Sequence, residues 1–179
     1  MSNDKNFKRI NNIILSALFA ALITVMTAFI KFNTGINEGY LHFGDSIIYL
    51  AACIIPAPYS LFCAALGGAL ADVLAGSAVW APFTAIIKAL NALVFVLVLK
   101  YKSKKDNKIM SAKSAVAGVI SGFVTVFGYL IAEGLLYTFP TAWTSVPFSI
   151  IQAAGSLIIF IIAASALDKI EFKKRFFKE

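Results

Sequence analysis

Long runs of apolar residues, separated by short polar or proline-containing stretches, make up most of this chain. A helix needs about 20 mostly apolar residues to cross a bilayer. By this rule the pattern predicts six membrane-spanning helices, of which the second is the shortest: residues 11–31, 43–55, 57–76, 82–100, 112–137 and 146–168. We therefore expect an all-α membrane protein in which residues 1–179 form a single transmembrane domain.

The five prolines agree with these limits. Pro56 and Pro58 separate the second and third spans, whereas Pro82 and Pro147 fall where a first helical turn tolerates proline. Pro140 is expected in the loop before the sixth span. No proline is therefore predicted inside a helix.

Composition supports the membrane assignment. Hydrophobic residues make up 60% of the chain and charged residues 14%, against roughly 25% charged in soluble domains. A chain of this size could not hide so much apolar surface from water. The first apolar run is longer than the 7–15 residues of a signal-peptide core, so we expect it to stay as a first helix.

Basic residues are distributed unevenly along the chain, which has a net charge of +7. Fourteen of the sixteen Lys and Arg precede the first span, surround the loop between the fourth and fifth spans, or follow the sixth; Lys31 and Lys88 are the exceptions. Such residues stay on the cytoplasmic side, which predicts that both termini are inside. Their position beside apolar segments favours orientation and contact with anionic lipids over nucleic-acid binding.

Four ionisable residues on four different spans share one depth in the predicted topology, in the outer half: Asp45, Asp72, Lys88 and Glu133. A charge at a helix centre costs about 2.5–3.5 kcal/mol on insertion scales, so it persists where it pairs or lines a polar cavity. One interpretation is a structural ion pair of Lys88 with Asp72 or Glu133. The other is a small-molecule pocket that opens outward.

Neighbouring polar and aromatic residues favour the pocket. Aromatic residues gather at the same end and form either a pocket wall or an interfacial belt: Tyr40, Phe43, Tyr49, Trp80, Phe83, Tyr137, Trp143 and Phe148. We predict that seven residues bind the substrate, with Asp45 and Asp72 as supporting charges: Tyr40, His42, Lys88, Asn91, Glu133, Tyr137 and Gln152. An aromatic wall suits a flat heterocycle.

The only histidine, His42, lies three residues before Asp45 in the stretch "EGYLHFGD". A zinc site needs three or four ligands, and no second histidine is available, so no metal or cofactor is expected. A serine hydrolase is disfavoured because no GxSxG occurs. We expect instead a helix start in which the carboxylate of Asp45 meets the positive helix end, with His42 on a loop that closes over the pocket.

Ala17 and Ala21 lie one turn apart in the first span. Small residues at this spacing let another helix approach closely, either a partner's or one of the chain's own. The chain has no GxxxxGK[ST] motif and so is not expected to hydrolyse ATP itself.

The stretches "GYLHFGDSIIYLAA" and "GALADVLAGSAVWAPFTAIIKAL", with six spans and the Ala17/Ala21 pair, resemble the substrate-binding S components of energy-coupling-factor (ECF) vitamin transporters, riboflavin-type subfamily. The resemblance implies a bundle in a bacterial plasma membrane that captures its ligand from outside. It also implies docking through Ala17 and Ala21 on a transmembrane T subunit, with two ATPase subunits supplying the energy. The S component itself would not be an enzyme.

The residues leave two other classes open. A stand-alone secondary transporter or channel would use the buried carboxylates as a proton relay. A membrane enzyme would use His42 and Asp45 as a base, but it lacks a nucleophile or metal constellation. The ligand also stays open among riboflavin, pyridoxine-like, pyrimidine and deazapurine compounds.

Overall fold

The computed structural model describes the backbone of residues 2–33, 40–100 and 108–176, and the side chains of 5–32, 41–100 and 108–175. The described chain is almost entirely helical, which confirms the predicted all-α class. Its helices are α1 (Ser2–Ala28), α2 (Gly44–Ile54), α3 (Ala57–Leu74), the 3₁₀ turn η1 (Ala78–Trp80), α4 (Ala81–Leu99), α5 (Ala112–Leu136), α6 (Phe139–Lys169) and α7 (Phe172–Phe176).

Five helices in the described part are long and apolar enough to cross a membrane, namely α1, α3, α4, α5 and α6. The second predicted span corresponds to α2, which has only 11 residues. Nine of those residues are buried, because α2 packs against α1, α3, α4 and α6 inside the bundle. The apolar character of α2 therefore reflects the protein interior as much as lipid. Six complete crossings remain a prediction.

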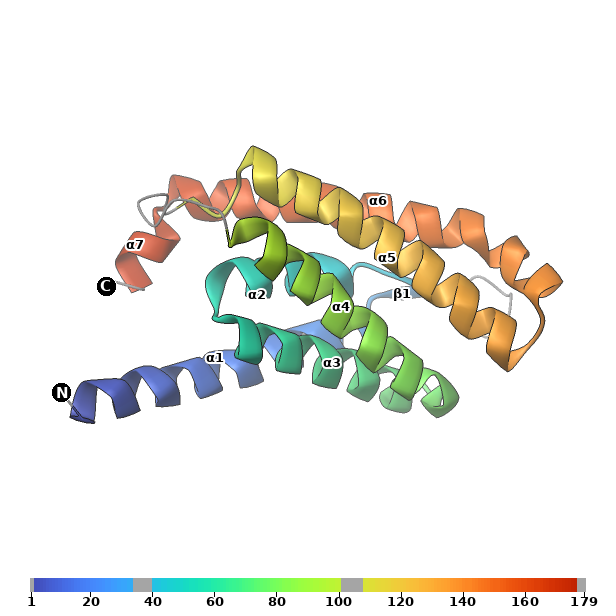
Figure 1. Cartoon of the computed structure of the whole chain (residues 1–179), viewed down its shortest axis with the longest axis horizontal. Helices are drawn as coiled ribbons and strands as arrows, with labels where there is room; N and C mark the ends of the chain where they lie inside the picture. The colour runs from blue at the N-terminus through green and yellow to red at the C-terminus, as the bar shows by residue number, and fades with distance from the viewer. Residues whose placement is uncertain (1, 34–39, 101–107, 177–179) are drawn as a thin grey trace.

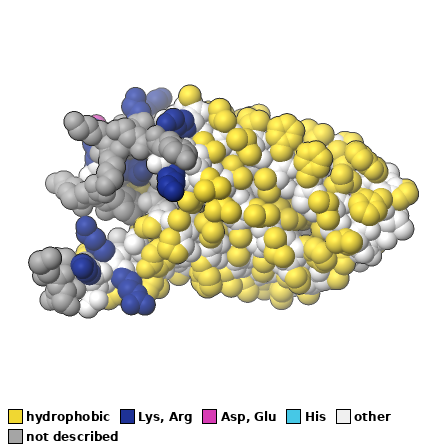
Figure 2. All heavy atoms as spheres, in the orientation of Figure 1, with side chains coloured by type: hydrophobic (Ala, Val, Ile, Leu, Met, Phe, Trp, Pro, Cys, Tyr) yellow, Lys and Arg dark blue, Asp and Glu magenta, His cyan; other side chains and the backbone are white. Residues whose placement is uncertain are grey.

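The helices form a bundle in which α1 and α3 lie on one side, α5 and α6 lie on the other, and α4 connects the two pairs (Figure 1). Both chain ends lie at the same end of the bundle (Figure 1). Apolar side chains cover the visible flank, and Lys and Arg gather at the end that holds the termini (Figure 2). This distribution is typical of a multi-pass membrane protein.

A short antiparallel hairpin precedes α2, and the sequence pattern did not predict it. Strand β1 (Lys31–Asn33) pairs with β2 (Tyr40–His42), so that Lys31 lies opposite His42. Each strand has three residues, too few to give a clear alternating pattern. The hairpin places His42, the last residue of β2, inside the bundle rather than on a free loop.

The sixth helix begins earlier than the apolar run predicted. It starts at Phe139, where the side chain of Thr138 accepts a hydrogen bond from the backbone N–H of Thr141 and Pro140 occupies the first turn. Two expectations are therefore wrong: Pro140 does not lie in a loop, and Pro147 lies inside α6. An internal proline is tolerated in membrane helices where neighbouring helices and Ser or Thr side chains compensate the lost hydrogen bond.

At the end that holds the termini, α6 is tied to the start of α5. The two carboxylate oxygens of Asp168 accept hydrogen bonds from the backbone N–H groups of Ile109 and Met110, at 2.7 and 2.8 Å. Ser111 then caps α5 through a reciprocal bond with Ser114. These contacts join the end of α6 to the segment that leads into α5.

Candidate functional site

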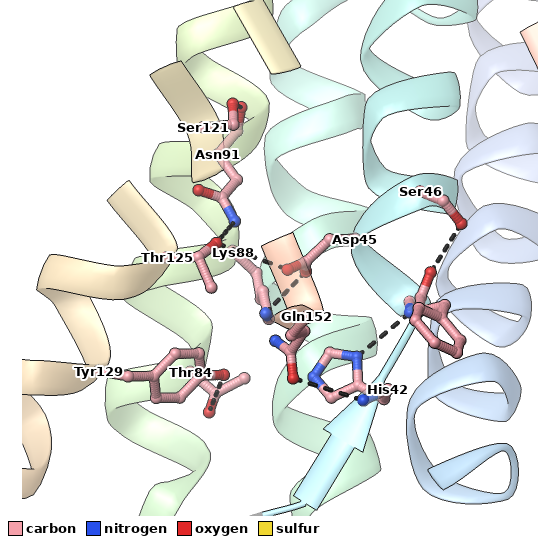
Figure 3. Close-up of polar contacts among 12 residues, drawn as sticks. His42, Asp45, Ser46, Thr84, Lys88, Asn91, Ser121, Thr125, Tyr129 and Gln152 are labelled. Carbon is pink, nitrogen blue, oxygen red and sulfur yellow. Dashed lines mark hydrogen bonds and ion pairs between the residues drawn. The ribbon is translucent and has the colours of Figure 1, made fainter. Parts of the chain in front are cut away.

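A buried ion pair lies at the centre of the predicted site (Figure 3). Lys88 Nζ of α4 is 2.7 Å from Asp45 Oδ1 of α2, and their side chains are 1% and 0% exposed. Gly68 of α3 leaves room for the lysine, because a Cβ there would come within 2.8 Å of Lys88 Cγ. The predicted pairing of Lys88 with Asp72 or Glu133 is therefore wrong. Asp45 is the partner because the first turn of α2 packs inside the bundle against α4.

A line of uncharged side chains extends from the ion pair toward the end of the bundle that holds the termini (Figures 1 and 3). Thr125 of α5 lies 3.5 Å from Asp45 Oδ2, at the limit of a hydrogen bond. Asn91 Nδ2 donates to Thr125 Oγ1 at 2.8 Å, and Ser121 Oγ donates to the backbone carbonyl of Asn91 at 3.1 Å. The contacts join α2, α4 and α5 through groups that sit entirely out of water.

Aromatic rings lie on the other side of the ion pair. Lys88 Nζ is 5.1 Å from the ring centroid of Tyr129, within the range of a cation–π contact. The Tyr129 hydroxyl and Thr84 Oγ1 are 3.2 Å apart. The Trp80 ring lies 6.1 Å from both Tyr129 and Tyr137. Trp80, Tyr129 and Tyr137 thus form the aromatic side of the site.

His42 is a buried capping group at the end of β2. Its Nδ1 accepts a hydrogen bond from the backbone N–H of Gly44, the first residue of α2, at 3.2 Å. Its own backbone N–H points at Gln152 Oε1 of α6, 3.4 Å away. Burial first, and the Lys88 ammonium second, lower the pKa of His42 from 6.5 to about 3, so the ring is neutral.

The expectation of a helix start at Gly44 and Asp45 is confirmed, with Asp45 in the first turn of α2. The roles of His42 and Asp45 at this helix start differ from the prediction. His42, 3% exposed, satisfies a free N–H of the helix end, and the carboxylate of Asp45 pairs with Lys88 instead. Gly44 is required at this point, since a Cβ would collide with Thr27 Oγ1 of α1.

The remaining predicted residues differ in how far they are buried. Asp72, Glu133 and Gln152 are buried, whereas Tyr137 at the end of α5 is 40% exposed. The backbone of Tyr40 belongs to β2, but its side chain lies outside the described residues, as do Glu38 and Gly39 of the expected lid.

Two of the predicted wall aromatics do not line this part of the site. Trp143 is 61% exposed, as expected for an interfacial ring. Tyr49 lies one turn further into the bundle than Asp45. There its ring stacks on Phe95 with centroids 4.7 Å apart and meets Phe160 edge-on at 5.8 Å. These three rings pack together beyond the polar region, on the side of the chain termini.

Several buried polar atoms in the described part have no hydrogen-bond partner there: Tyr49 OH, Trp80 Nε1, Asn91 Oδ1 and Ser156 Oγ. An unsatisfied buried group costs about 1–3 kcal/mol, so such atoms mark places where water or a ligand binds. No three His, Cys, Asp or Glu side chains of the described residues gather as a metal ion requires. The chemistry of the site is hydrogen bonding and stacking around a compensated charge pair.

The sequence family of ECF-type riboflavin transporter S components matches residues 7–169 of this chain. The chain belongs to the family of ECF-type S components. These proteins are the substrate-binding subunits of vitamin transporters and work with T and ATPase subunits. The chain is also similar to a protein of Pyrococcus woesei described as "Uncharacterized protein in gap 3'region". The two are 30% identical over 137 residues, which cover 76% of this chain and 88% of that one. The resemblance noted from the sequence is thereby confirmed.

Sequence reasoning missed four residues that take part in polar or cation–π contacts around the ion pair of this S component: Thr84, Ser121, Thr125 and Tyr129. The signal was present as a helical repeat, because residues three or four apart share a face. Thr84 precedes Lys88 by one turn on α4. On α5 the other three lead, one turn at a time, to Glu133. Uncharged residues received less weight than charged ones, although both lie on the same faces.

Proposed function

We propose that this S component captures a vitamin or vitamin precursor, a flat heterocycle, from the outside of the cell. The substrate would contact Lys88, Asn91, Glu133, Tyr137 and Gln152, with β2 and its residues Tyr40 and His42 as the cover. The observation that carries the proposal is the set of unsatisfied buried polar atoms around the Lys88–Asp45 pair, in a chain of this family.

The depth of the site supports capture from outside. Lys88 is the eighth residue of the 19-residue α4, and Gln152 is the fourteenth of the 31-residue α6. Both positions lie nearer the helix ends that are remote from the basic cluster (Figure 2). Because basic residues stay cytoplasmic, the site would open outward and the basic end would face the ATPase subunits.

The surface of α1 supports docking on a T subunit through Ala17 and Ala21. A neighbouring face of α1 holds α3: Ser16 Oγ donates to the Tyr59 carbonyl at 3.1 Å, and Thr24 Oγ1 lies 3.0 Å from the Gly67 carbonyl. Ala17 and Ala21 are exposed, so packing among the described residues leaves both side chains accessible. Small residues on a free helix face allow close approach of a second helix.

Ligand identification tests this proposal. The purified chain, denatured after washing in detergent, should release a small heterocycle that mass spectrometry identifies, and the same compound should rebind with one site per chain in the absence of partner subunits. Uptake in cells should require the ATPase subunits. Uptake that persists without them and follows the proton gradient would instead favour a stand-alone transporter using the buried carboxylates.

A further inference from the structure

The positive charge at the site is compensated within the chain. Among the described residues, the buried basic side chains are Lys88 and His42. Lys88 is paired with Asp45 at 2.7 Å. His42 accepts the Gly44 N–H through Nδ1, which is the geometry of a neutral imidazole. Asp72 and Glu133 are also buried. Their side chains are acidic and supply no positive charge.

A phosphate that reached these buried groups would therefore find no free positive charge. Taking an ion out of water costs several kcal/mol after relaxation, and only a well-placed opposite charge offsets that cost. The Lys88 ammonium has further N–H donors, but its positive charge is already balanced by the carboxylate of Asp45. The arrangement opposes an anionic ligand.

Recognition then falls to uncharged atoms whose hydrogen-bonding character the structure fixes. Asn91 donates through Nδ2 to Thr125, which leaves Oδ1 as a buried acceptor without a partner among the described residues. Trp80 Nε1 is an unpartnered donor beside the rings of Tyr129 and Tyr137, and its residue is 6% exposed. An acceptor and a donor are thus open on the two sides of the ion pair.

We infer that the site selects an uncharged planar heterocycle that carries both an N–H or O–H donor, for Asn91 Oδ1, and an acceptor, for Trp80 Nε1, and that it rejects the phosphorylated form of the same compound. The inference rests on the proposed function and adds the charge class of the substrate. It also assigns Trp80 as a specificity-determining residue.

Matched ligand pairs test the charge class. Affinities of the full chain in detergent at pH 7.5 would be measured by calorimetry for riboflavin and its 5′-phosphate, pyridoxine and its 5′-phosphate, and 4-amino-5-hydroxymethyl-2-methylpyrimidine and its phosphate. In any pair that binds, the neutral member should bind about a hundredfold tighter, because several kcal/mol of uncompensated ion burial opposes the phosphate. A ratio below tenfold would overturn the inference while leaving the proposed function intact. Absence of binding by all six compounds would count against both.

A gain of affinity provides a second test. Asp45→Asn removes the counter-charge of Lys88, so it should improve the phosphorylated member relative to the neutral one by at least tenfold. Lys31→Ala, which removes an exposed side chain of the hairpin opposite His42, should leave the ratio unchanged. If Lys31→Ala instead abolishes phosphate binding, the phosphate is held at the mouth and the inference fails.

The two tryptophans of the chain give a matched comparison for recognition. Trp80→Phe keeps a ring and loses the N–H, and should weaken the neutral ligand about tenfold, the loss of one buried hydrogen bond. Trp143→Phe, at a ring that is 61% exposed, should change nothing. Equal affinities for the two variants, both folded by their melting curves, would remove Trp80 from the site.

Discussion

Breaking the Lys88–Asp45 pair should destabilise the S component strongly. Lys88→Met removes the ammonium and leaves the carboxylate of Asp45 buried, at 0% side-chain exposure, without its counter-charge. Removing one partner of a buried ion pair costs about 3–5 kcal/mol. With roughly 2–4 °C per kcal/mol for a chain of this length, the melting temperature should fall by roughly 6–20 °C.

Two further variants separate the causes. The double variant Lys88→Met with Asp45→Leu removes both charges, and it should recover most of the lost stability because an apolar pair avoids the desolvation cost. Lys174→Met breaks an ion pair of the same 2.7 Å length whose side chains are 56% exposed, and it should leave the melting temperature unchanged. The assay is thermal unfolding in detergent, followed by tryptophan fluorescence, without ligand.

The ligand then divides structural from recognition roles. If Lys88 also contacts the substrate, the double variant should regain stability but still bind at least tenfold more weakly than wild type. A drop of less than 2 °C for Lys88→Met would refute the claim that this pair holds α2 against α4. Full recovery of affinity in the double variant would show that Lys88 is structural alone.

Three other predictions concern orientation, coupling and pH. A cysteine at Ser103 should resist membrane-impermeant labelling from outside intact cells, whereas one at Thr141 should react, because the basic residues place the 101–111 loop inside. Enlarging both Ala17 and Ala21 to Trp should block uptake while the purified variant keeps its ligand affinity, since both side chains are exposed on α1 away from the polar site. The pKa of His42 is about 3 when folded and 6.5 when unfolded, so the unfolded chain takes up the proton first. Stability should therefore fall by up to about 1.4 kcal/mol per pH unit as the pH drops below 6.5. His42→Asn, which retains an acceptor for the N–H of Gly44, should give a flatter melting profile between pH 7.5 and 5.

Each of these tests has a control on the same chain. For coupling, Val116→Trp with Ile120→Trp enlarges an exposed face of α5 and should leave uptake intact; equal loss in both double variants would reject a specific docking face. For orientation, labelling of position 103 from outside would show that the topology is the reverse of the predicted one. For pH, an identical slope in wild type and His42→Asn would assign the acid sensitivity to the carboxylates instead.

The membrane helices could be predicted from the sequence because lipid imposes a simple requirement. A span must be long, apolar and internally hydrogen-bonded, and α3, α4 and α5 begin and end within about two residues of the apolar runs. The α6 start was misplaced because hydropathy does not register a cap such as Thr138, which extends the helix through polar residues.

The burial of the four ionisable residues was predictable, but the direction of each side chain around its helix axis was not. Counting residues from the helix ends put Asp45, Asp72, Lys88 and Glu133 at one level, which was sufficient to propose a site. It could not choose a partner for Lys88, because that choice depends on how α2 is rotated and enclosed. A helix that is apolar on all sides gives no periodic signal for its orientation. His42 was misjudged for a related reason: its capping bond to Gly44 depends on a hairpin of two three-residue strands.

The central claim is that this chain alone holds a small heterocycle among the polar atoms around Lys88 and Asp45. Native mass spectrometry of the purified protein, without partner subunits, tests it most directly. The wild type should carry one vitamin-sized ligand per chain, and Asn91→Leu, which removes the open acceptor Oδ1, should lose that ligand while keeping a cooperative melting transition. A folded Asn91→Leu variant that retains the ligand at wild-type occupancy, or a wild type that carries none and binds none of the vitamins offered, would contradict the claim.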